Sequence, residues 1–142
     1  AHDDHVGDTV KLADMTGAKV VAQVELGGFL ASKGCETVTP NYGGTVQFDG
    51  GTVKLVPAWH TSSHSEGGPL GQPAGLVVRV GDKTIYFAGD TTWCPEVADA
   101  IEAHVPDVIV VNAGAAQFLE GGLIIMGLGD VVEVCRAAPR AT

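Results

Sequence analysis

The sequence is poor in basic residues. Its 142 residues include 8 lysines and arginines against 17 aspartates and glutamates, which gives a formal net charge of −9 at pH 7. A chain of this charge repels phosphate backbones and anionic headgroups, and it has no basic stripe that offsets the repulsion. Nucleic acids and membranes are therefore not expected partners, and a small-molecule substrate is.

Cysteine is also scarce, and long apolar runs are absent. Cys35, Cys94 and Cys135 are odd in number and far apart, which excludes a disulfide framework and a CxxC metal or redox motif. A reducing, cytoplasmic location is the corresponding expectation. No apolar run approaches the roughly 18 residues that a membrane-spanning helix requires.

What the chain does have is apolar content and glycine. Hydrophobic residues make up 45% of it, and 20 residues are glycine, about double the usual share of ~7%. At roughly 100 to 200 residues per domain, the length predicts a single globular domain over residues 1–142.

Apolar residues at helical spacing predict four helices, over residues 6–17, 25–34, 95–105 and 129–138. The first is expected to begin just after His5. Gly17 and Gly34 are the expected stops of the first two helices, and Asp130 is the expected N-cap of the last.

Five extended segments are predicted, and two of them are hairpins. Residues 45–59 and 75–90 each contain two β-rich runs around an Asp-Gly or Gly-Asp turn, the strongest local hairpin signal. Shorter strands are expected over residues 18–23, 37–40 and 107–114. Tandem hairpins predict a largely antiparallel sheet. Residues 60–75, rich in Gly, Ser and Pro, are expected to form an irregular loop at the rim of an active site.

The first chemical candidate is the cluster His2, Asp4 and His5. Two imidazoles and a carboxylate this close in sequence can converge on one cation, and such mixed nitrogen and oxygen sets suit zinc, manganese or iron. The alternative is a polar, solvated segment that happens to hold two histidines.

His60 and Asp90 each follow a predicted strand directly. Side chains at the ends of neighbouring strands can converge over one edge of a sheet. The alternatives are a hydrogen-bonded, partly buried histidine at position 60 and an Asp90 that caps the next helix together with Thr91 and Thr92.

Two further features of the 60–75 loop have competing interpretations. His64 could replace His60 as a ligand or contact substrate, although a solvated loop histidine is the favoured interpretation. Ser62 and Ser63 lie near histidines, but the sequence has no GxSxG elbow, so a serine hydrolase is not indicated.

Glycines and tryptophans near the candidate ligands also allow two interpretations each. The glycine-rich run 121–130 could bind an anion at the start of the following helix, but a tight loop near the site is favoured. Trp59 and Trp93 lie close to His60 and Asp90 in sequence and could form a pocket wall, although core packing is the default for tryptophan.

Taken together, HDDHVGD, PAWHTSSHS and FAGDTT, in this order and with these hairpins between them, resemble the metallo-β-lactamase superfamily. The nearest resemblance is to its metal-dependent hydrolase branch of sugar-phosphate lactonase-like proteins. It implies an α+β fold, a four-layer αββα sandwich in which two sheets pack between helices.

The same resemblance implies a fragment cut at both ends. The family motif HxHxDH would begin one residue before Ala1, and the family's last histidine would lie beyond Thr142. Residues 1–142 are then a partial metallo-hydrolase domain that lacks N-terminal strands and the C-terminal end. An exposed sheet edge and exposed apolar surface are expected, and they would allow a homo-oligomer.

By position in the family motif, the resemblance implies two divalent metal ions. His2, His60 and Asp90 would hold the first, and Asp4, His5 and Asp90 the second, with Asp90 as the bridge. Asp4 would also orient the nucleophile and is the expected catalytic residue. Zinc is the first expectation, with manganese and iron as alternatives.

The implied reaction is hydrolysis, in which a water ionised between the metals attacks a carbonyl or phosphorus centre. A lactone or another ester-type small molecule is the expected substrate, and a phosphodiester is the alternative. A different class of function stays open, namely a non-catalytic remnant or binding module that keeps the scaffold.

Overall fold

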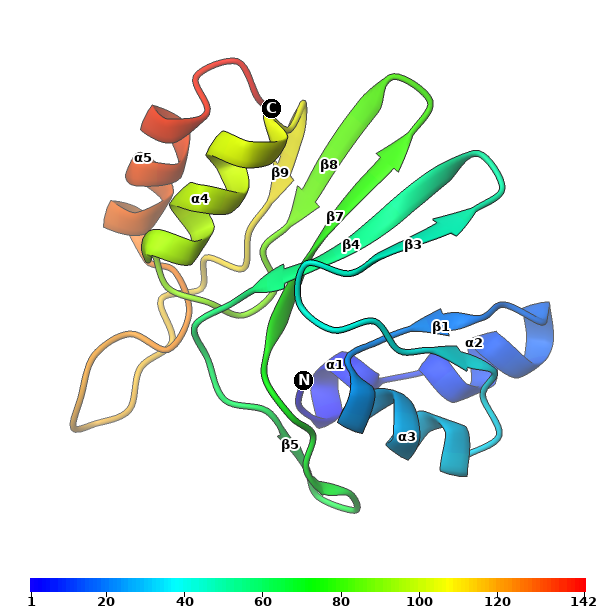
Figure 1. The fold of residues 1–142 in the computed structure, drawn as a ribbon. Coiled ribbons are helices and arrows are strands. Elements are labelled where there is room, and N and C mark those ends of the chain that lie inside the picture. Colours follow the sequence, from blue (N-terminus) through cyan, green and yellow to red (C-terminus); the bar gives the residue numbers. More distant parts are fainter.

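The computed structural model describes residues 1–142 and is organised by one five-stranded mixed sheet (Figure 1). The strand order is β3-β4-β7-β8-β9, and every neighbouring pair is antiparallel except β8 and β9. The strands are β3 (Thr45–Phe48), β4 (Gly51–Pro57), β7 (Ala74–Val80), β8 (Lys83–Phe87) and β9 (Val108–Val110). The two predicted hairpins and the largely antiparallel sheet are confirmed.

Both hairpins turn through two residues between the paired strands. Phe48 pairs with Gly51 in the first, and Val80 with Lys83 in the second. The glycine in each turn has a positive φ, +90° at Gly50 and +59° at Gly81. These values explain the Asp-Gly and Gly-Asp signals, because a side chain at a positive φ is strained and glycine is not.

Five helices flank the sheet: α1 (Asp3–Val6), α2 (Thr9–Thr16), α3 (Val24–Ser32), α4 (Pro95–His104) and α5 (Leu128–Ala137). The prediction of a single helix that begins after His5 is wrong, because the helix is interrupted at Gly7, where φ is +42°. Asp130 as an N-cap is also wrong. Gly127 is the N-cap, and Asp130, three residues later, accepts a hydrogen bond from the Gly127 N–H at 3.0 Å.

Two small sheets complete the fold. β1 (Val20–Val21) pairs in parallel with β2 (Thr37–Val38), and β5 (Ser63–His64) pairs antiparallel with β6 (Gly68–Pro69). The 60–75 segment therefore contains a short hairpin that its composition did not predict.

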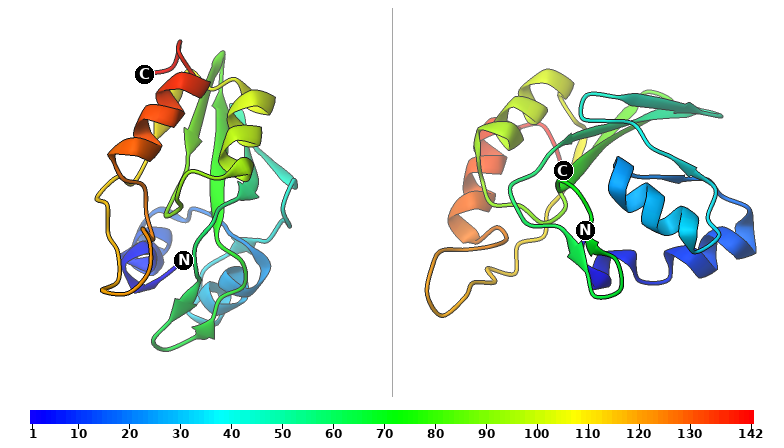
Figure 2. Two further views of the ribbon diagram at one scale, coloured as in Figure 1. Left: turned by 90° about the vertical axis from the view of Figure 1, so that its left-hand side faces the viewer. Right: turned by 60° about the horizontal axis from the view of Figure 1, so that its bottom comes forward.

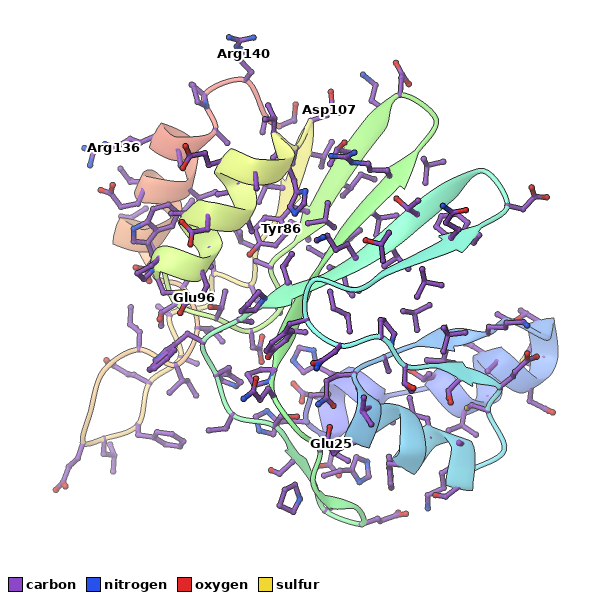
Figure 3. The ribbon with its side chains drawn as sticks, in the orientation of Figure 1. Glu25, Tyr86, Glu96, Asp107, Arg136 and Arg140 are labelled. Atoms are coloured by element: carbon purple, nitrogen blue, oxygen red, sulfur yellow. The ribbon has the colours of Figure 1, made fainter.

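The elements form layers around the five-stranded sheet. Helices α4 and α5 lie on one side of it, and α1, α2 and α3 with the β1–β2 sheet lie on the other (Figures 1 and 2). The main core fills the space between the sheet and α4 and α5, and Tyr86 is completely buried there (Figure 3). A second, smaller cluster joins Ala13, Leu30 and Cys35. The α+β fold is confirmed.

The opposite face of the sheet carries partly exposed apolar side chains. Tyr86 faces the helices, so its neighbour Phe87 faces the other way. Phe87 pairs with Val110 on β9, and both are exposed over more than a third of their surface.

All three cysteines are free thiols. None of the helices combines the length and apolarity needed to cross a membrane.

Candidate metal centre

Five predicted ligands converge at one edge of the sheet. His2, Asp4 and His5 come from α1 and its N-cap, His60 follows β4, and Asp90 follows β8. Their potential ligand atoms form two sets, each with all atoms within 4.8 Å of one another. The sets are His2, His60 and Asp90, and Asp4, His5 and Asp90. They are the two sets that the resemblance implied, and Asp90 belongs to both.

Asp90 is the centre of this arrangement. Its Oδ2 lies 2.8 Å from His5 Nε2 and 3.7 Å from His60 Nε2, and its Oδ1 accepts a hydrogen bond from Asn112 Nδ2 at 2.7 Å. Partial burial acts to raise the pKa of Asp90, but hydrogen bonds from Asn112 and His5 outweigh it and hold the pKa below its usual value. The group is therefore a carboxylate at neutral pH.

The His60 ring is held by the backbone. Its Nδ1 lies 2.7 Å from the carbonyl oxygen of Ile124, and a carbonyl can only accept, so Nδ1 carries the proton. The lone pair is then on Nε2, the nitrogen nearer Asp90. A hydrogen bond of this kind sets the tautomer of metal-binding histidines.

His2 approaches His60 from α1. The two rings meet edge to face with centroids 5.1 Å apart, and His2 Nε2 lies 3.2 Å from Thr61 Oγ1. Desolvation and the neighbouring His60 lower the pKa of His2. The neutral imidazole that this favours is the form that binds metals.

These donor sets fit divalent cations. One set offers two imidazoles and a carboxylate, and the other offers two carboxylates and one imidazole. Neutral imidazole and carboxylate oxygen together suit zinc, manganese and iron, whereas the free cysteines contribute no soft thiolate ligand here.

His64 lies apart from both sets. Its Nε2 is 3.5 Å from Asp3 Oδ1, and its ring packs against Phe29 at 4.6 Å between centroids. Asp3 also accepts a hydrogen bond from the Ser65 N–H at 3.2 Å and another from the Ser65 hydroxyl. The loop that follows His60 is thus tied to the helix that carries Asp4 and His5.

The alternative in which Asp90 caps the next helix is wrong, because the N-cap of α4 is Cys94.

Thr91 links two segments near the candidate ligands. It is completely buried, and its Oγ1 accepts from the Trp59 N–H and donates to the Thr92 carbonyl, both at 2.9 Å. This threonine joins the segments after β4 and β8, so it holds His60 and Asp90 near each other.

Two supporting groups were not predicted from the sequence, the Asn112 side chain and the Ile124 carbonyl. Asn112 follows strand β9 in the way that His60 follows β4 and Asp90 follows β8, so its strand-end position is a signal that could have found it. The contact between His60 and the Ile124 backbone has no residue-type signal, because any residue supplies a carbonyl.

Two cavities meet at the ligand cluster and share His2, His5, His60 and Asp90. One has a volume of about 150 Å³ and extends toward apolar side chains of β1, α3 and the sheet. The other is an open groove of about 870 Å³.

The two tryptophans have different environments. Trp59 lines the groove and is 67% exposed, so the prediction that it packs in the core is wrong. Trp93 does pack against the main core.

A mixed sheet between helices, with histidines and aspartates gathered at its strand ends, defines a protein of the metallo-β-lactamase class. The family model of the beta-lactamase superfamily domain matches residues 1–142, and the chain belongs to this family.

Curated relatives include several proteins named UPF0173 metal-dependent hydrolase. The one from Ligilactobacillus salivarius is 48% identical over 91 residues, which cover 64% of this chain and 40% of the relative. The one from Carboxydothermus hydrogenoformans is 41% identical over 115 residues, which cover 80% and 51% of the two chains. The chain thus spans about half the length of these relatives or less.

Solved structures show the same fold. Igni18, a metallo hydrolase from the archaeon Ignicoccus hospitalis, superposes with a TM-score of 0.78 at 28% identity, covering 99% of this chain and 57% of that one. The isothiocyanate hydrolase from Delia radicum gut bacteria has a TM-score of 0.72 at 30% identity, covering 87% and 50%.

Proposed function

We propose that this chain carries the metal centre of a metal-dependent hydrolase that acts on a small molecule. The observation that carries the proposal is the pair of three-residue sets that share Asp90. The names of the relatives and the family membership support it.

The roles of the residues follow from their positions. His2, His60 and Asp90 would hold one divalent cation, and Asp4, His5 and Asp90 the second, with zinc as the first candidate. Such cations, when bound, supply Lewis-acid catalysis and lower the pKa of a coordinated water toward ~7.

The surrounding groups of the chain prepare this site. Asn112 keeps Asp90 charged and oriented, and the Ile124 carbonyl holds the proton of the neutral His60 ring on Nδ1, so that Nε2 carries the lone pair. Asp4 lines the open groove with a largely exposed carboxylate. It is the proposed catalytic residue, because a carboxylate there can accept a hydrogen bond from the attacking water and orient it.

The proposed substrate is a lactone or another ester-type small molecule. The resemblance to lactonase-like hydrolases supports this class. The named activity of the structural neighbour from Delia radicum gut bacteria adds isothiocyanates to the compounds worth assaying. Both classes present an electrophilic carbon that hydroxide attacks.

The test is metal content per chain, measured by elemental analysis after purification without chelators. We expect two ions in the parent, one in His60→Ala and one in His5→Ala, because each histidine belongs to a different set. Asp90→Ala should lose both. His104→Ala is the matched control, since this histidine ends α4 and belongs to neither set.

Hydrolysis is then measured with γ-butyrolactone and phenyl isothiocyanate. Turnover that needs metal and falls in Asp4→Asn supports the hydrolase. Metal binding without turnover of any ester, lactone or isothiocyanate would instead support a binding module. Metal content that is unchanged in Asp90→Ala would refute the assigned centre.

A further inference from the structure

The residues that line the open groove form two chemical groups. One group is polar and consists of the candidate ligands, Thr61 and Asn112. The other group, here called the apolar side of the groove, consists of Trp59, Ala116, Phe118, Leu123, Ile124 and Ile125. A substrate with its reacting carbon at the ligand cluster would therefore place its remaining atoms against an apolar surface.

Most of this apolar side belongs to one segment, residues 115–126, here called the rim hairpin. Its two arms are joined by hydrogen bonds from Ala115 N to Met126 O at 3.0 Å and from Ile124 N to Ala116 O at 2.8 Å. The segment projects from the body of the fold between β9 and α5 (Figure 1, orange). The Ile124 carbonyl also holds His60, so the rim hairpin is fixed to the candidate metal centre.

Some exposed side chains of the rim hairpin line the groove and others do not. Phe118 is 69% exposed yet lines the groove, as does Leu123. Leu119, the neighbour of Phe118, is fully exposed and lines neither cavity at the cluster. An exposed phenyl ring beside a reactive cluster loses water contact when a ligand covers it, and this favours apolar ligands.

No lysine or arginine lines either cavity at the cluster. The positive charges beside the histidines would be the Ala1 amino group in the smaller cavity and the divalent cations of the proposed centre, none of which lies on the rim hairpin. Arg136 and Arg140 lie on and beyond α5, at the far end of the molecule (Figure 3). An anionic substituent lying along the rim hairpin would lose hydration without gaining a cationic partner from the chain. Substrates that place a phosphate or carboxylate group along the rim hairpin are therefore disfavoured.

We infer that the groove selects uncharged substrates with an apolar substituent, which packs against Trp59, Phe118 and Leu123. Phe118 and Leu123 are then specificity-determining residues. This inference rests on the proposed hydrolase function, which it deepens by naming the substrate class.

The test compares γ-butyrolactones that carry hydrogen, phenyl or carboxylate at the γ carbon. Covering about 60 Å² of apolar surface at ~25 cal/mol/Å² corresponds to about a tenfold gain, so kcat/KM for the phenyl lactone should be about tenfold that of the unsubstituted one. The carboxylate should react more slowly than either. In Phe118→Ala/Leu123→Ala, the phenyl preference should fall to about twofold or less.

Leu119→Ala is the matched control, because it removes an apolar side chain from the same hairpin without touching the groove. It should keep the parent preference. An unchanged preference in the double variant, or equal rates for all three lactones, overturns the inference while the hydrolase proposal stands.

Equilibrium binding of 2-phenyltetrahydrofuran, which has no bond to hydrolyse, separates the two proposals. Binding that weakens about fivefold or more in Phe118→Ala/Leu123→Ala, but not in Leu119→Ala, supports the groove assignment even where no lactone is turned over. Absence of binding, or tighter binding of tetrahydrofuran-2-carboxylate, overturns it.

Discussion

Replacement of Asn112 by alanine should weaken metal binding without unfolding the chain. Asn112 donates a 2.7 Å hydrogen bond to Asp90 Oδ1, and the Asp90 side chain is partly buried, with 18% of its surface exposed. A hydrogen bond to a charged group contributes roughly 1.5–3 kcal/mol. At about 1.4 kcal/mol per factor of ten, affinity should fall roughly 10- to 100-fold, in line with about the same loss when other groups that orient metal ligands are removed.

The variant should also change the pH dependence of metal binding. Asn112 helps to hold the pKa of Asp90 below its usual value, so its removal raises that pKa. A proton then competes with the metal at higher pH, and affinity begins to fall earlier as the pH is lowered.

The assay is competition with a chromophoric chelator, using Zn²⁺ and Co²⁺ across pH 5 to 8, with circular dichroism of each metal-free variant. Asn41→Ala is the control, because the Asn41 side chain accepts only from the Tyr42 N–H, away from the cluster. An affinity for Asn112→Ala within twofold of the parent would refute the assigned role of this residue.

Three further predictions concern other contacts. Tyr86→Phe should leave the free energy of unfolding unchanged or raise it by roughly 1 kcal/mol in urea titrations, because the buried Tyr86 hydroxyl has no hydrogen-bond partner; a clear loss of stability would contradict this. Asp107 accepts from the Thr84 N–H at 2.8 Å, and this bond, with Lys83 nearby, lowers its pKa. The stabilisation that the Asp107 carboxylate gives the folded state is therefore fully present at a pH above the ordinary pKa of 3.8. It is lost as the pH falls through the lower pKa of the folded state. Asp107→Asn should melt below the parent at pH 7, and the two melting temperatures should converge in acid; a constant difference would disprove the assignment. Asp3→Ala removes the hydrogen bonds between α1 and Ser65, so chelator competition should show weaker metal binding. An affinity equal to that of the parent would show that these hydrogen bonds do not position the ligands.

Much of the fold was predictable because its signals are local. The hairpins depend on Gly50 and Gly81, whose positive φ makes glycine the natural residue at those turns. The α4 helix begins at Pro95, as its fixed φ favours. The errors were local as well. Gly7 breaks the first helix, and Asp130 reaches back to Gly127 from inside the last one, and both depend on backbone angles that residue types alone leave open.

The candidate site divides along a similar line. Residue types and close spacing indicated His2, Asp4 and His5, and strand-end positions indicated His60 and Asp90. The family motif then implied how these five residues divide between two metal ions. Sequence also favoured His60 over His64, and the structure places His60 Nε2 within 3.7 Å of Asp90 Oδ2. Metal binding by these residues stays a prediction.

By itself, the sequence determined the order of the main helices and strands and the residue types that could bind a cation, because turn geometry and side-chain chemistry are properties of short segments. Only the tertiary structure decided that Asn112 supports Asp90, that the Ile124 carbonyl orients His60, and that Trp59 lines a groove. Such contacts join segments far apart in the chain, and their geometry exists only once the sheet has brought the strand ends together.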